Sequence, residues 1–160
     1  MGSIYLLRHA KSSWDDPGLA DHERPLAARG IRNAAALPDH IRAAGVAPGL
    51  VLCSTAVRAR ETLAAILGAL AGELVVAIQS DLYGAPASSL LASLRAVPAG
   101  VESVMLVGHN PGLEELAVLL AGDEAPGRMP TAALVALSTE SAWPALAERT
   151  CHVEAVTVPR

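Results

Sequence analysis

Residues 3–10 read Ser-Ile-Tyr-Leu-Leu-Arg-His-Ala, and this stretch decides the fold. A short apolar run of this kind predicts a buried β-strand over Ser3–Leu7, which ends where Arg8 and His9 begin. Buried strands are typical of a parallel sheet that helices cover on both faces. Ligands bind such sheets at the carboxyl ends of the strands, so Arg8 and His9 lie where a functional site is expected.

Outward from this stretch, short strand-like runs alternate with longer segments that have helical spacing. Residues 10–25 form a polar loop, and Pro38 is expected to kink or split the first helix because proline removes a backbone donor from a helix interior. The other predicted strands lie at 50–53, 74–78, 104–107, 132–137 and 153–158, and the predicted helices at 26–44, 57–70, 88–96 and 111–120, with a short helix near Trp143. This order predicts one α/β domain over residues 1–160, built as three layers with a mainly parallel central sheet flanked by helices.

The composition is that of a globular protein and excludes several other classes. The chain has 160 residues, of which 52% are hydrophobic and 18% charged, with a formal net charge of −4 and no run of basic residues. These values argue against disorder, and against nucleic acid or a membrane surface as partners. No apolar stretch approaches the roughly 20 residues that a membrane-spanning helix needs. No secretory signal is visible, so we expect a cytoplasmic protein whose Cys53 and Cys151 are buried free thiols.

Three segments carry the residue types of a phosphate-handling site, and each follows a predicted strand. The segments contain, in chain order, Arg8 and His9, then Arg58, then His109. Because the carboxyl ends of parallel strands share one edge of a sheet, we expect these side chains to converge there. An arginine can donate two parallel hydrogen bonds to phosphate oxygens, and a neutral imidazole is a good nucleophile toward phosphorus at neutral pH. The set indicates phosphate recognition combined with a nucleophile.

Two other kinds of site fit these residues less well. The sequence has no His-Glu-x-x-His motif, no paired Cys-x-x-Cys and no carboxylate cluster beside either histidine. The flanking arginines would also repel a cation, so we expect neither a metal nor another cofactor. A serine hydrolase is disfavoured because Ser54 lacks a Gly-x-Ser-x-Gly turn.

Four motifs together resemble the histidine phosphatase superfamily, in its phosphoglycerate-mutase-like branch. They cover most of the chain and follow the order of that family: Arg8-His9-Ala10-Lys11, then Arg24-Pro25-Leu26 with Arg29-Gly30, then Ser54 with Arg58-Ala59 and Glu61-Thr62, then Gly108-His109-Asn110-Pro111-Gly112. Within the superfamily the chain most resembles SixA-type protein phosphohistidine phosphatases, because it is short and carries the Arg-Pro-Leu segment. The resemblance implies a phosphoglycerate-mutase-like fold and phosphatase activity.

The resemblance also implies roles for individual residues. His9 would be the nucleophile that becomes phosphorylated. Arg8, Arg58 and His109 would be catalytic residues that bind the oxygens of the transferring phosphoryl group, and Arg24 is expected to join them. Fixed donors of this kind stabilise the charge of a loose transition state.

One departure from the family pattern bears on the substrate. Residues 80–85 contain no Glu where relatives that act on alcohol phosphates place a proton donor, and Asp81 is the candidate substitute acid. An alkoxide leaves poorly without an acid, whereas the free ring nitrogen of phosphohistidine can take a proton from solvent. Gln79–Glu102 is also too short for the cap of larger relatives, which favours an open site.

These observations predict a protein phosphohistidine phosphatase, whose partner is a phosphorylated protein such as a histidine phosphotransfer domain. The alternative is a small-molecule phosphomonoesterase on the same scaffold, which would act on a phosphorylated metabolite and use Asp81 or another residue as the acid. A third reading is a non-catalytic phosphate-binding module. The complete set of histidines and arginines argues against it, since binding alone does not need His9.

Overall fold

One sheet of six strands runs through the computed structural model, which describes residues 1–159. The strands are β1 (Gly2–Arg8), β2 (Leu50–Ser54), β3 (Val75–Gln79), β4 (Ser103–Gly108), β5 (Leu134–Thr139) and β6 (Cys151–Thr157). Their order across the sheet is β3-β2-β4-β1-β5-β6. The strands from β3 to β1 pair in parallel, whereas β5 runs antiparallel to β1 and β6 antiparallel to β5. The predicted mainly parallel sheet is confirmed.

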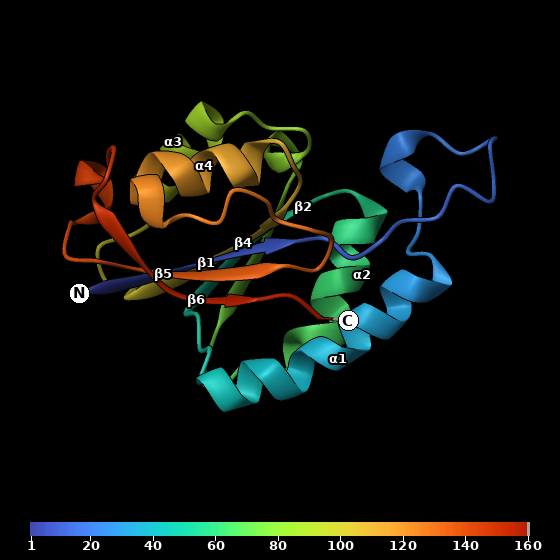
Figure 1. Cartoon of the computed structure of the whole chain (residues 1–160), viewed down its shortest axis with the longest axis horizontal. Coiled ribbons are helices and arrows are strands. Elements are labelled where there is room, and N and C mark those ends of the chain that lie inside the picture. Colours follow the sequence, from blue (N-terminus) through green and yellow to red (C-terminus); the bar gives the residue numbers. More distant parts are fainter. Residues whose placement is uncertain (160) are drawn as a thin grey trace.

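Four α-helices cover the two faces of this sheet. They are α1 (Ala28–Ala44), α2 (Val57–Ile66), α3 (Ala87–Arg95) and α4 (Gly112–Ala121), and short 3-10 turns form η1 (Asp21–Glu23), η2 (Leu67–Ala69), η3 (Ser80–Leu82), η4 (Gly122–Glu124) and η5 (Trp143–Ala145). Figure 1 shows α3 and α4 on one face and α1 and α2 on the other, which is the three-layer arrangement that the sequence predicted. Among the described residues, no helix has the length and apolar character that crossing a membrane requires.

The strands supply side chains to two hydrophobic cores, one on each face of the sheet. In β4, Leu106 packs into the core beneath α3 and α4, whereas Met105 and Val107 pack into the core beneath α1 and α2. Successive side chains of a strand point to opposite faces, so a continuous apolar run fills both cores. Burying each such side chain stabilises the fold by about 1.5–3 kcal/mol. The carboxyl ends of the strands are therefore held firmly in place.

Of the two outcomes expected at Pro38, a kink or a split of the first helix, the split does not occur. α1 runs unbroken from Ala28 to Ala44 with Pro38 inside it, so the helix is not split. A proline in a helix interior costs about 3 kcal/mol or more. Leu37 and Ile41, on either side of Pro38, are both fully buried, and their packing in the core offsets this cost.

The fifth strand begins later than predicted, at Leu134 instead of residue 132. Ala132 has a φ of 64°, in the left-handed region that strand residues do not adopt. Its N–H donates to the carbonyl oxygen of His9 (3.0 Å). The segment before β5 thus anchors the chain just beyond the end of β1.

The loop between β1 and α1 is fixed by backbone contacts at its base. Ala27 donates its N–H to the carbonyl oxygen of Lys11 (2.8 Å), and Ser13 donates its N–H to that of Pro25 (2.7 Å). Gly30, in the first turn of α1, packs directly against the backbone of Lys11, where a Cβ atom would overlap the carbonyl oxygen. Glycine at this motif position lets α1 approach the base of the loop closely.

Gly30→Ala is therefore expected to destabilise the protein. Alanine favours a helix over glycine by roughly 1 kcal/mol, but overpacking against a backbone costs more, so we expect a net loss of about 1–3 kcal/mol in the free energy of unfolding. Gly68→Ala is the control, because a Cβ atom at Gly68 meets no described atom within 4 Å. Urea denaturation measures both variants. Wild-type stability of Gly30→Ala would contradict this packing explanation.

Candidate active site

The pairing of β1 with β4 brings two histidines together. Arg8, the last residue of β1, is level with Gly108, the last residue of β4, so His9 and His109 follow on adjacent strands. Their ring centroids are 5.1 Å apart. Arg58 reaches the same place from the first turn of α2, which follows β2 on the other side of β4. The predicted convergence of these side chains is observed, and His9, Arg58 and His109 are each 7% exposed.

His9 is oriented so that one ring nitrogen is free to react. Its Nδ1 donates to the carbonyl oxygen of Ala10 (2.7 Å), and Nε2 therefore carries the lone pair of the neutral ring. The Nε–H of Arg58 faces this Nε2 at 3.4 Å. Burial, together with His109 and the positive charge of Arg58 and Arg8, lowers the pKa of His9 from 6.5 to about 3. At neutral pH the ring is uncharged and can attack phosphorus.

The hydroxyl of Thr62 links the two chain segments that carry His9 and Arg58. It accepts the N–H of Ala10 (3.0 Å) and donates to the carbonyl oxygen of Arg58 (2.7 Å). Thr62 is fully buried, so this contact is shielded from water. Thr62 belongs to one of the four sequence motifs, and the sequence alone predicts no role for it. In the structure it fixes the end of β1 to the first turn of α2.

His109 is oriented by Ser54, the last residue of β2. The Ser54 hydroxyl accepts the N–H of Ala56 (3.2 Å) and has one proton of its own to donate. Among the described residues the acceptor in reach of this proton is Nε2 of His109, at 2.8 Å, and this assigns the direction of the bond. The proton of the His109 ring is then on Nδ1. Burial, followed by the charge of Arg58, lowers the pKa of His109 from 6.5 to about 4, so the ring is a neutral donor at pH 7.

Two buried donors at the site have no hydrogen-bond partner within residues 1–159: Nδ1 of His109 and Nε of Arg8. A terminal nitrogen of Arg8 donates to the carbonyl oxygen of Met129 (3.0 Å), which fixes the side chain. Leaving a buried donor unpaired costs about 1–3 kcal/mol. These two N–H groups are therefore candidates to donate to the oxygens of a ligand.

The terminal nitrogens of Arg58 are turned away from His9. One donates to the carbonyl oxygen of Asp21 (2.7 Å) and the other to the Asp21 carboxylate (3.0 Å). From the sequence, the fork of this arginine is expected to bind phosphate. The structure instead presents its Nε edge to His9 and gives the fork to Asp21, a residue that the sequence indicated only as a partner of nearby arginines.

The carboxylate of Asp21 has two further donors. It accepts hydrogen bonds from a terminal nitrogen of Arg24 (2.8 Å) and from the hydroxyl of Tyr83. The Tyr83 hydroxyl and the two arginines hold the pKa of Asp21 well below its usual range, so the carboxylate is ionised at neutral pH. The same hydrogen bond raises the pKa of Tyr83.

Arg24 lies beside the site, and its hydrogen bonds fix the loop. Its three guanidinium nitrogens donate to the Ser12 hydroxyl, the Ser13 carbonyl oxygen and the Asp21 carboxylate. The guanidinium carbon also lies 3.2 Å from the centre of the Trp14 ring. The expected contact of Arg24 with a phosphoryl group stays a prediction, because its donors are occupied in this structure.

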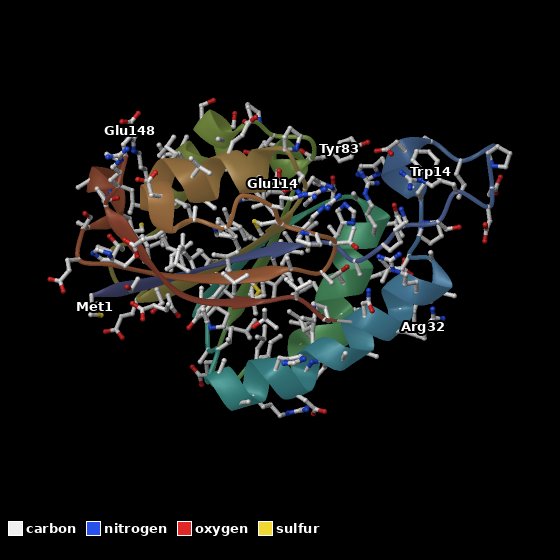
Figure 2. All side chains as sticks on the ribbon, viewed as in Figure 1. Met1, Trp14, Arg32, Tyr83, Glu114 and Glu148 are labelled. Atoms are coloured by element: carbon white, nitrogen blue, oxygen red, sulfur yellow. The ribbon has the colours of Figure 1, made fainter. Side chains whose placement is uncertain are left out.

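The turn after β3 contributes Tyr83 to the site, whereas Asp81 lies apart from it. Asp81 is exposed beside a groove between β2, β3 and α3, and no hydrogen bond to the catalytic groups is found in the described part of the chain. The ring of Tyr83 packs edge-on against His109, with centroids 5.5 Å apart. Figure 2 shows Tyr83 and Trp14 at the same end of the molecule, opposite Met1.

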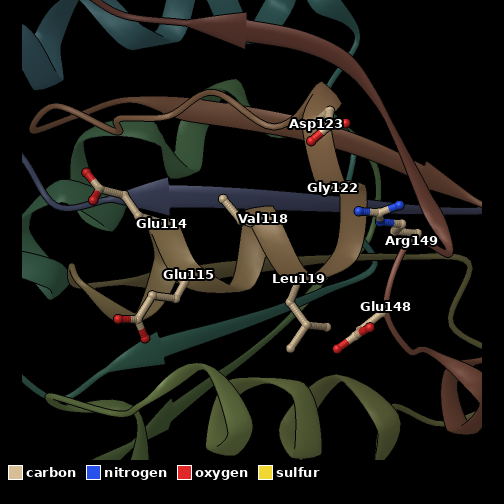
Figure 3. A pocket seen from close by; sticks show the side chains of 8 residues that line it. All are labelled: Glu114, Glu115, Val118, Leu119, Gly122, Asp123, Glu148 and Arg149. Carbon is tan, nitrogen blue, oxygen red and sulfur yellow. The ribbon is translucent and has the colours of Figure 1, made fainter.

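A hollow of about 550 Å³ along α4 is a separate feature (Figure 3). It is lined by Glu114, Glu115, Val118, Leu119, Gly122, Asp123, Glu148 and Arg149. Its four carboxylates and single guanidinium surround an apolar floor, and this excess of negative charge disfavours a phosphate. Within residues 1–159, no group of three or more His, Cys, Asp or Glu side chains is arranged to hold a metal ion.

Comparison with known proteins relates the chain to one family. The model of the histidine phosphatase superfamily (branch 1) matches residues 4–83, which include Arg8, His9, Arg24 and Arg58. An uncharacterised protein of Mycobacterium tuberculosis is 36% identical over 146 residues, covering 86% of this chain and 89% of that protein. Two solved structures, from Nakamurella multipartitia and Agrobacterium tumefaciens, are of proteins assigned as the phosphohistidine phosphatase SixA. Each has a TM-score of 0.84 and 31% identity to this chain and covers 99% of it, and the match covers 96% and 99% of those chains respectively.

The ring of His9 is expected to stay neutral far below the ordinary pKa of histidine. In NMR spectra of the histidine rings, the His9 signals, assigned by their loss in His9→Asn, should show no titration midpoint above about pH 5. The unfolded chain binds a proton at His9 near pH 6.5 and the folded chain does not, so lowering the pH from about 7.5 to about 5 should reduce stability. A midpoint close to 6.5 would contradict the burial argument.

Proposed function

Because the chain belongs to the histidine phosphatase superfamily, we propose that it is a phosphatase that removes phosphoryl groups from phosphohistidine on a protein, with His9 as the nucleophile. The observation that carries the proposal is the neutral ring of His9, whose Nε2 faces the Nε–H of Arg58, at a strand edge where Nε of Arg8 and Nδ1 of His109 have no partner among the described residues. A reactive lone pair and free donors at one strand edge suit transfer of an anionic group.

The proposed reaction has two transfers. The Nε2 lone pair of His9 attacks phosphorus, an N–P bond forms, and the bond from phosphorus to the ring nitrogen of the substrate breaks. The second ring nitrogen of the substrate takes a proton from solvent, so the group leaves as neutral imidazole. Water then attacks phospho-His9, the N–P bond breaks, inorganic phosphate leaves, and Nε2 regains its lone pair.

The donors around His9 stabilise the transferring group. Nε of Arg8, Nδ1 of His109 and Nε of Arg58 would each donate to an oxygen of the phosphoryl group, whose charge is spread over these oxygens in a loose transition state. Because the donors are fixed before the substrate arrives, they need no rearrangement during the reaction. One such donor contributes about 10²–10³-fold in rate.

Three carboxylates could be considered as a general acid, and the surroundings of each favour a substrate with an N–P bond over an alcohol phosphate. Asp21 is ionised and accepts hydrogen bonds from three side chains, so it has no proton to give. Glu114 accepts from the side chain of Asn110 and from the backbone of Met129, and Asp81 is exposed on another groove. An alkoxide needs an acid in order to leave, whereas a protonated phosphohistidine does not.

The surroundings of the site support a protein as the substrate. The described chain between β3 and β4 holds η3 and α3, and α3 packs into the core through Leu90, Leu91 and Leu94. At the rim, Trp14 is 69% exposed and Tyr83 36% exposed (Figure 2). A residue displayed on a phosphorylated protein, such as a histidine phosphotransfer domain, can reach such a site. A small phosphorylated metabolite, the alternative substrate, is usually enclosed more fully.

His9→Ala should abolish turnover and leave the fold intact. In the wild type, a rapid quench without acid should trap a phosphoenzyme that acid hydrolyses and alkali leaves intact, as expected of an N–P bond. The same quench of His9→Ala should trap none. Circular dichroism and thermal unfolding verify the fold of the variant. Substantial activity in a folded His9→Ala protein would contradict the proposed nucleophile.

The substrate preference should follow the leaving group. We expect kcat for a phosphohistidine protein to exceed kcat for alkyl phosphates by at least roughly 100-fold, the usual contribution of a general acid. Asp81→Asn should change neither rate, and EDTA in every assay should leave both rates unchanged. Good turnover of alkyl phosphates that Asp81→Asn abolishes would establish the small-molecule phosphatase instead. Loss of activity with EDTA, restored by a divalent ion, would revive a metal mechanism.

A further inference from the structure

We propose that Asp21 is a positioning residue, which holds Arg58 so that its Nε–H faces Nε2 of His9. The proposal deepens the phosphatase mechanism above and rests on it. Asp21 does not touch the reacting atoms in this proposal. It acts through Arg58, by fixing which edge of the guanidinium is presented to the phosphoryl group.

The contact between Asp21 and Arg58 determines the orientation of the guanidinium. Both terminal nitrogens of Arg58 donate to Asp21, one to its carbonyl oxygen (2.7 Å) and one to its carboxylate (3.0 Å). A planar guanidinium held at both terminal nitrogens cannot rotate without breaking at least one bond. The remaining donor, Nε, then points toward His9 at 3.4 Å.

Asp21 is itself held firmly enough to serve as an anchor. Its carboxylate accepts from Arg24 and from the hydroxyl of Tyr83 as well as from Arg58. Arg24 is buried, and its guanidinium lies over the ring of Trp14. Its other two nitrogens donate to the carbonyl oxygen of Ser13 and to the hydroxyl of Ser12. The anchor thus extends from Arg58 into the base of the loop.

An alternative role for Asp21 is that of an internal competitor, whose carboxylate would occupy the donors that bind the phosphoryl oxygens. The contacts of Asp21 argue against this role. In the described part of the chain, no hydrogen bond joins it to Arg8, His9 or His109. The free donors Nε of Arg8 and Nδ1 of His109 stay unpaired although the carboxylate is close to Arg58. Asp21 therefore binds the terminal nitrogens of Arg58 and leaves its Nε–H facing His9.

A positioning role and a merely structural role predict different kinetics for Asp21→Asn. The change keeps the size of the side chain and removes a negative charge near the bound phosphoryl group. Loss of orientation should lower kcat by roughly 10–100-fold. The affinity for tungstate should change much less than kcat, because the loss of one oriented donor and the removal of repulsion between two anions act in opposite directions. A merely structural role would instead lower the melting temperature and weaken tungstate binding.

Glu23→Gln is the matched control. Glu23 lies on the same turn, η1, and its carboxylate accepts a hydrogen bond from His22, whereas within residues 1–159 no hydrogen bond or ion pair joins it to an arginine. It undergoes the same change of charge, and we expect kcat, tungstate affinity and melting temperature to stay at wild-type values. If Glu23→Gln lowered kcat as much as Asp21→Asn, the effect would be general to the loop and the proposal would fail.

The effect of Asp21 should also depend on Arg58. Arg58→Ala should lower kcat by roughly 10²–10³-fold, and adding Asp21→Asn to it should change kcat by less than about threefold, because the residue to be oriented is gone. Full additivity of the two losses would overturn the proposal. So would a rise in kcat/KM for Asp21→Asn alone, which is the signature of a competitor.

A spectroscopic measurement separates this proposal from the proposed function. In the wild type, the Nε–H signal of Arg58, assigned by its loss in Arg58→Ala, should be sharp and slow to exchange with water. Asp21→Asn should broaden it and Glu23→Gln should not. This test needs no turnover, so an absence of phosphatase activity would refute the proposed function and leave the role of Asp21 decided by the signal. An unchanged signal in Asp21→Asn would overturn the positioning role.

Discussion

The parallel pairing of β1 with β4 is the constraint on which the rest of the site depends. It sets the ends of the two strands level, so that a histidine leaves each strand at the same height. Because β2 lies on the other side of β4, the helix that follows β2 delivers Arg58 to the same edge. The two cores on either face hold these strands, and a shift of register by one residue would turn every buried side chain to the wrong face.

Burial and positive charge act together on the two histidines. Both rings are almost completely buried, and protonating either would place a further charge beside Arg8 and Arg58. The neutral form of His9, which is the nucleophilic form, is therefore the stable one at neutral pH. Asp21 lies on the far side of Arg58, where its charge balances arginine without forming a hydrogen bond to either histidine.

The sequence predicted the sheet, the helices and the convergence of His9, Arg58 and His109, because these follow from apolar periodicity and from strand ends. It could not predict the contact of Asp21 with Arg58, because that contact depends on how a polar loop without periodicity folds over α2. The role of Tyr83 could not be predicted either, because the search for a proton donor on its turn indicated only the carboxylate of Asp81. Pro38 shows tertiary packing prevailing over a local preference.

The central place of β1 also governs when the site can form. Leu6 pairs with Leu106 of β4 on one side and with Val135 of β5 on the other. β1 therefore cannot complete its pairing until both of these later strands have been synthesised. On the ribosome His9 is made early, whereas His109 and the two strands that flank β1 are made only after residue 100. Contacts so distant in sequence form slowly, because the entropy of closing a long loop is lost before the contacts can stabilise the chain. A nascent or truncated chain would have an exposed strand edge and no assembled phosphoryl site, so catalytic competence coincides with completion of the fold.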